Sequence, residues 1–152
     1  HLLCDEQGLY PSELNTWEKA VLTVEMERAG FKFWYRNPDR PSQDSLGIAY
    51  ADGDDTKVVR PDFIFFAEQA GTVVADIIDP HGFHLADALP KLRGLAVYAE
   101  THSQFYRRVG AIAQVGDKLR ILDLTRADVR QAIIEATSAE ALYRGALAGD
   151  YA

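Results

Sequence analysis

The sequence has only one cysteine, Cys4, so it cannot form a disulfide within the chain. It has no apolar run of the roughly 18 residues that a membrane-spanning helix needs. Basic residues are also scarce: 16 Lys and Arg against 23 Asp and Glu give a net charge of −7. This charge excludes attraction to nucleic acid by overall charge alone. We therefore expect a protein of a reducing, cytoplasmic compartment that does not enter a membrane.

The composition is that of a folded domain. The 152 residues are 47% hydrophobic and 26% charged, which excludes intrinsic disorder and suits a single domain over residues 1–152. We expect its core at about residues 14–136. The chain starts at His1 and shows no signal peptide, so we interpret it as a fragment of a longer protein.

Hydrophobic periodicity and turn residues predict a mixed α/β fold. Strands are expected at 31–36, 46–50, 57–66, 72–79, 105–115 and 118–124, and helices at 15–29, 87–102, 125–136 and from 138. Pro61 lies inside one of these strands and predicts an edge or a bulge there, because proline has no N–H group to donate. The strand at 72–79 is almost continuously apolar, which is typical of burial on both faces.

Two carboxylates interrupt these β-prone segments. Asp62 and Asp79 are 17 residues apart in adjacent strands joined by a short turn, so antiparallel pairing would bring both to one end of the sheet. His81 follows two residues after Asp79 and would project from the same face. Paired carboxylates suit Mg²⁺ or Mn²⁺ and phosphodiester chemistry. In the alternative, Asp62 pairs with Arg60 or Arg36, and Asp79 caps the following loop.

The motifs around these carboxylates resemble the PD-(D/E)xK nuclease superfamily. Within it they are most similar to the C-terminal nuclease domain of type III restriction subunits and related superfamily 2 helicase proteins. The segments that carry the resemblance are Trp34–Pro38, Leu46–Tyr50, Arg60–Phe63 and Val73–Gly82. The likeness extends from about Leu14 to Leu124 and implies a restriction-endonuclease-like, three-layer α/β/α domain with a central mixed sheet.

The resemblance also implies roles for individual residues. Asp62 matches the first metal carboxylate, Asp79 the second, and Glu18 an additional acid on the first helix. His81 stands where the family has a lysine that orients the attacking water. The implied function is DNA cleavage with Mg²⁺ or Mn²⁺ in a restriction or phage-defence protein, with a helicase motor supplying the substrate. The alternative is a degenerate nuclease fold that binds DNA or braces the motor.

Several further residues are candidates for the same site. Lys91, on the helix after the motif, would either replace the missing lysine, contact backbone phosphate or simply face solvent. Basic side chains at the ends of the expected elements predict a rim that contacts the DNA backbone. This rim consists of Arg36, Arg60, Arg107 and Arg108. Asp76 falls on the opposite face of its strand from Asp79 and is interpreted as a structural carboxylate.

The histidines suggest a third interpretation, in which His81, His84 and His102 bind zinc together with Asp79. No Cys-x-x-Cys pair supports it. His102 is instead expected at the C-terminal end of a helix, where the helix dipole favours it.

Overall fold

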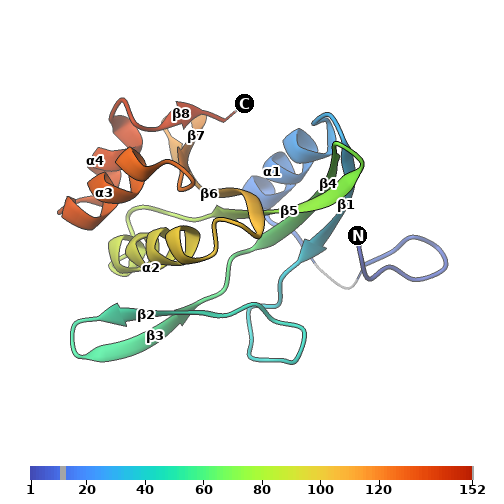
Figure 1. The fold of residues 1–152 in the computed structure, drawn as a ribbon, viewed down its shortest axis with the longest axis horizontal. Coiled ribbons are helices and arrows are strands. Elements are labelled where there is room, and N and C mark those ends of the chain that lie inside the picture. The colour runs from blue at the N-terminus through green and yellow to red at the C-terminus, as the bar shows by residue number, and fades with distance from the viewer. Residues whose placement is uncertain (11–12, 152) are drawn as a thin grey trace.

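A mixed β-sheet lies at the centre of the protein (Figure 1). The structure is a computed structural model and describes residues 1–10 and 13–151. The strands are β1 (Phe31–Arg36), β2 (Ile48–Asp52), β3 (Asp55–Val59), β4 (Phe63–Gln69), β5 (Thr72–Pro80), β6 (Tyr106–Val115), β7 (Lys118–Asp123) and β8 (Gly149–Asp150). The helices are α1 (Thr16–Met26), α2 (Ala88–Thr101), α3 (Ala127–Glu135) and α4 (Ala139–Arg144).

The main sheet has the order β1-β4-β5-β6-β7-β8. Its neighbouring strands are antiparallel except β5 and β6, which run parallel. The crossover between these two strands contains α2, as a parallel connection requires. The mixed sheet that the sequence predicted is therefore confirmed.

The sheet is covered on both faces. Ile78 belongs to a buried cluster with Val21 of α1, whereas the preceding Ile77 packs with Leu95 of α2 and Ile133 of α3. Because consecutive residues of a strand point to opposite faces, α1 covers one face while α2, α3 and α4 cover the other. The near-continuous apolar pattern of β5 follows from this burial on both sides.

The predicted single strand at 57–66 is wrong. The chain forms β3, leaves it at Arg60, and begins β4 at Phe63. β3 pairs only with β2, and these two strands form a separate hairpin that extends away from the main sheet beneath α2 (Figure 1). Pro61 lies at the break, where its missing N–H group would have interrupted a continuous ladder.

Most other boundaries agree with the sequence within a few residues. The first helix ends at Met26 instead of Ala29, and β8 was not predicted. Asn15 caps α1 in a reciprocal capping box with Glu18. None of the helices in the described part of the chain is long and apolar enough to cross a membrane.

Candidate functional site

Asp62 and Asp79 lie side by side where β4 begins and β5 ends. The register that pairs Phe63 with Ile78 places these two residues opposite each other at the next position. The backbone N–H of Asp62 donates to Oδ1 of Asp79 over 3.0 Å. Asp79 is only 4% exposed, whereas 23% of the Asp62 side chain is exposed. The juxtaposition expected from their spacing is confirmed.

Both carboxylates line a surface hollow of about 430 Å³, here called the carboxylate hollow. Its walls come from the end of β3, the start of β4, the end of β5 and the first turn of α2. The titratable side chains in its lining are Asp39, Arg60, Asp62, Asp79, His81 and Lys91. Acidic and basic groups that are far apart in sequence therefore share one solvent-accessible depression.

Asn37 fixes the backbone that carries Asp62. Its side-chain amide is buried and donates to the carbonyls of Leu46 and Pro61, both over 2.9 Å. Its backbone N–H donates to the carbonyl of Asp62 over 2.9 Å. This asparagine therefore ties the break between β3 and β4 to the end of β1. The sequence analysis did not identify this role, although a polar residue at the end of an aromatic strand was a signal for it.

Arg36 links Asp62 to Glu18. Its guanidinium contacts Oδ1 of Asp62 and Oε1 of Glu18, each at 2.7 Å. Glu18 is 6% exposed and also completes the capping box of α1. The expected phosphate contact by Arg36 is corrected, because this guanidinium is mostly buried and neutralises two carboxylates. Pairing of Asp62 with Arg36 or Arg60 was the alternative expected from the sequence, and the structure shows the pair with Arg36.

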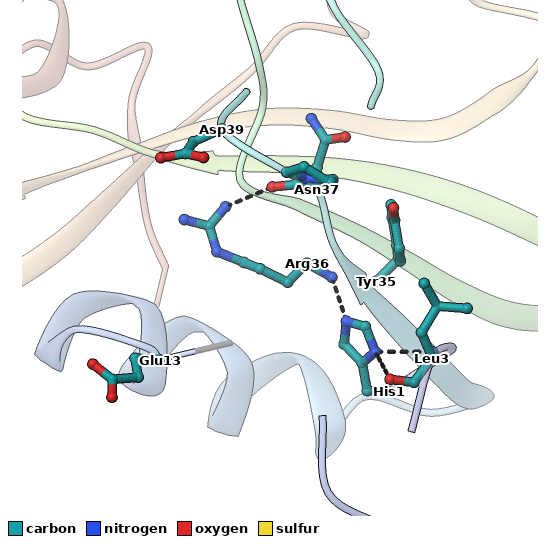
Figure 2. Close-up of a pocket in the computed structure, with 8 residues that line it drawn as sticks. His1, Leu3, Glu13, Tyr35, Arg36, Asn37 and Asp39 are labelled. Carbon is teal, nitrogen blue, oxygen red and sulfur yellow. Dashed lines mark hydrogen bonds between the residues drawn. The ribbon is translucent and has the colours of Figure 1, made fainter. Parts of the chain in front are cut away.

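The other side of Arg36 faces a second hollow of about 380 Å³ (Figure 2). Figure 2 shows the His1 ring beside the Arg36 backbone, whose N–H donates to Nε2 of His1 over 2.9 Å. The guanidinium also donates to the carbonyl of Asn37 over 3.2 Å. Asp39 lines both hollows. These contacts hold the arginine that neutralises Asp62.

The charge around Asp62 remains unbalanced despite Arg36. Burial, and after it the neighbouring charge of Asp79, raises the pKa of Asp62 to about 7. Arg36 acts in the opposite direction and lowers this pKa. Glu18 adds to the repulsion. The site therefore has more negative charge than its own cation compensates.

His81 reaches Asp79 as the sequence predicted. Its Nδ1 lies 3.4 Å from Oδ2 of Asp79, and its backbone N–H donates to the carbonyl of Ile112 over 2.8 Å. Its Nε2 is buried and has no hydrogen-bond partner within the described residues. The ring is thus fixed by Asp79 on one side and has an unused nitrogen on the other.

The zinc interpretation finds no support in the geometry. Across residues 1–10 and 13–151, no group of three or more His, Cys, Asp or Glu side chains is arranged to hold a metal ion. His102 instead forms the C-cap of α2, as predicted, and its ring packs against Tyr98 and Phe105.

Lys91 and Arg60 both reach the carboxylate hollow. Lys91 forms an ion pair with Asp87 at 2.8 Å, and this contact lowers the pKa of Asp87. Asp62 pairs with Arg36, and within the described residues Arg60 has no ion pair. These two cations are therefore the basic side chains that line the hollow near the carboxylates.

Arg107 and Arg108 do not line this hollow, and their expected contact with the DNA backbone stays a prediction. Nε of Arg107 donates to Asp76 over 3.0 Å, and Nη2 of Arg108 donates to it over 2.7 Å. Arg108 also pairs with Glu25 of α1, which accepts from Tyr151 over 2.7 Å. Asp76 and Glu25 are fully buried, so both arginines are needed to neutralise them. Asp76 is structural, as predicted.

Comparison with known proteins identifies a family and a relative of this chain. The chain is 58% identical over 151 residues to Protein YagJ of Escherichia coli (strain K12). This match covers 99% of the chain and 62% of the relative, so the chain spans less than two thirds of that protein. No solved structure matches the chain. The pattern of the YagJ family matches residues 1–152, and the chain belongs to this family.

Proposed function

We propose that the carboxylate hollow is the active site of a metal-dependent nuclease that hydrolyses phosphodiester bonds. The observation that carries the proposal is the facing pair of Asp62 and Asp79, joined by a 3.0 Å hydrogen bond in a hollow that also contains Arg60 and Lys91. Carboxylates suit a divalent cation, and the basic side chains suit the phosphate of a substrate.

The chemistry of the donor set fits Mg²⁺ or Mn²⁺. Mg²⁺ sites commonly use one or two carboxylates and complete their coordination with water and substrate phosphate. Asp62 and Asp79 would hold the ion, which supplies an activated water and neutralises charge on the phosphate. The raised pKa of Asp62 supports this fit, because a cation relieves the repulsion that raises it.

The arrangement of elements also supports the proposal. A mixed sheet with α1 on one face and α2 to α4 on the other agrees with the three-layer, restriction-endonuclease-like fold that the sequence resemblance implies. Glu18 acts through Arg36, which sets the charge and position of Asp62. DNA as the substrate and a helicase motor as the partner remain predictions from the resemblance.

A second candidate function is a non-catalytic domain of the same fold that binds DNA or braces a motor. Two observations favour it. His81 replaces the lysine expected at its position, and a neutral imidazole provides less positive charge for the transition state. Arg36 already occupies one oxygen of Asp62, so a metal would have to share that carboxylate.

Cleavage of supercoiled plasmid and single-stranded DNA in Mg²⁺ or Mn²⁺ tests the proposal. We expect cleavage by the wild type and its loss in Asp79→Asn, which keeps an oxygen to accept from the Asp62 N–H. Asp117→Asn, in the exposed turn after β6, is the matched control and should cleave normally. Cleavage that survives in Asp79→Asn would refute the assignment.

The second candidate is tested with His81→Lys. If the wild type does not cleave and this variant gains metal-dependent cleavage, the fold is a nuclease whose site has lost its lysine. If neither protein cleaves while both bind DNA, the non-catalytic function is supported.

A further inference from the structure

Some of the residues that line the carboxylate hollow have buried polar atoms without a hydrogen-bond partner in the described chain. Within the described residues, four buried side-chain nitrogen or oxygen atoms have no hydrogen-bond partner. Two of them, Nε of Arg60 and Nε2 of His81, belong to residues that line this hollow. A buried polar group without a partner is costly, so each one in a native structure calls for an explanation such as a bound water or ion.

Arg60 is held in place by the fold but is not neutralised by it. It follows β3 directly, at the point where the chain passes from the hairpin to the main sheet. Gly47 lies against this segment, and a Cβ on it would be 2.9 Å from Val58 and 3.7 Å from Nη2 of Arg60. Asp62, two residues further on, is paired with Arg36. The guanidinium therefore lines the same hollow as two carboxylates and forms no ion pair in the described chain.

Lys91 enters the same hollow from α2. Its ammonium is 25% exposed and contacts Asp87, the N-cap residue of this helix. The first turn of α2 has few free N–H groups, because Ala88 and Lys91 donate to the carbonyls of Leu85 and Asp87, each over 3.0 Å, and Pro90 has none. Lys91 is therefore the positive group that this helix contributes to the hollow.

We propose that Arg60 and Lys91 form a phosphate-binding subsite beside the Asp62–Asp79 pair. Arg60 provides the fork of N–H donors, including the buried Nε, and Lys91 provides a point charge from the other wall. The subsite offsets the repulsion between a phosphate and the carboxylates. Its assignment to a substrate phosphodiester rests on the proposed nuclease function, whereas phosphate binding itself needs no metal.

Titration with inorganic phosphate and with 5′-phosphorylated dithymidine, both in EDTA, tests this subsite by calorimetry and by the Nε–Hε NMR signal of Arg60. We expect Arg60→Gln and Lys91→Gln each to weaken binding about tenfold, which corresponds to one charge-assisted hydrogen bond or ion pair. Arg144→Gln removes an exposed charge on α4 and should bind like the wild type. Arg60→Lys keeps the charge without the Nε donor and should bind with intermediate affinity.

The two ligands identify the source of the phosphate. Tighter binding of the dinucleotide supports a nucleic acid backbone, and equal affinities support binding of free phosphate at the same subsite. Unchanged affinity in both Arg60→Gln and Lys91→Gln, in variants whose circular dichroism shows a native fold, overturns the proposal. Absence of phosphate binding by the wild type also overturns it.

Failure of the subsite and failure of the nuclease function can be distinguished. Phosphate binding that depends on Arg60 in a protein without metal-dependent cleavage would retain the subsite and reject the nuclease. Cleavage that depends on Asp79, in a protein whose phosphate binding is independent of Arg60, would retain the nuclease and reject the subsite. Asp79→Asn should bind phosphate at least as tightly as the wild type, because it removes a negative charge from the hollow.

Discussion

Replacement of Asp79 by Asn should make the stability of the protein less dependent on pH. Burial and the charge of Asp79 raise the pKa of Asp62 from its ordinary 3.8 to about 7. The unfolded chain therefore releases this proton near pH 4, whereas the folded protein retains it to about pH 7. As pH rises through this interval, the folded state loses stability, because it alone bears the cost of the buried charge.

The magnitude follows from the two pKa values. A tenfold change in proton affinity is worth about 1.4 kcal/mol, so the complete effect is on the order of 4 kcal/mol. Between pH 5 and 8, ionisation of Asp62 should lower the free energy of unfolding of the wild-type protein by about 3 kcal/mol. In Asp79→Asn the charge of Asp79 is gone, and burial and the charge of Glu18 still raise the pKa of Asp62. Between pH 5 and 8, the free energy of unfolding should therefore fall less in this variant than in the wild type, by a difference of about 1 kcal/mol or more.

Urea unfolding of both proteins at pH 5 and pH 8 measures this difference. Groups that do not contact Asp79 have the same surroundings in both proteins, so their contributions largely cancel. Carbon NMR of the Asp62 carboxyl group reports its pKa directly, and Asp117→Asn provides the control for removal of an exposed carboxylate. Identical changes in unfolding free energy for wild type and Asp79→Asn would refute the coupling of the two carboxylates.

Three further predictions concern metal, the buried ion pairs and the hairpin. Removal of divalent cation with EDTA should lower the Tm more at pH 8 than at pH 6, because metal binds deprotonated carboxylates; equal shifts would contradict this. Arg108→Met should cost about 3 kcal/mol in urea unfolding, since Glu25 and Asp76 lose a shared cation, and a cost below about 1 kcal/mol would show that they do not need it. Gly94→Ala places a Cβ 2.5 Å from that of Tyr50, so it should destabilise the protein by about 1 kcal/mol or more. A gain in stability would mean that helix propensity outweighs this close packing.

The sequence predicted the candidate site largely through local rules. The spacing of Asp62 and Asp79 and the turn between their strands were enough to place them together, because antiparallel register follows from a short connection. The proximity of His81 to Asp79 follows from the two-residue period of an extended chain. The capping box at Asn15 is likewise formed by residues that are close together in the sequence.

The positions of the arginines were beyond the reach of these rules. A guanidinium at the end of a strand is equally suited to a phosphate or a carboxylate, and the sequence does not reveal which group lies opposite. The fold places Arg36 between Asp62 and Glu18, and Arg108 between Asp76 and Glu25. The pairings with Glu18, Asp76 and Glu25 were not predicted, because these acids lie on segments that are distant in the sequence.

The sequence by itself determined the mixed α/β class, the strand that is buried on both faces, and the meeting of two carboxylates, since each depends on periodicity or on neighbours along the chain. Only the tertiary structure decided that the chain changes sheets around Pro61, that Asn37 fixes this break, and that Arg60 and Lys91 share a hollow with Asp62. These features depend on contacts between distant segments, where packing and charge neutralisation select the partner of each side chain.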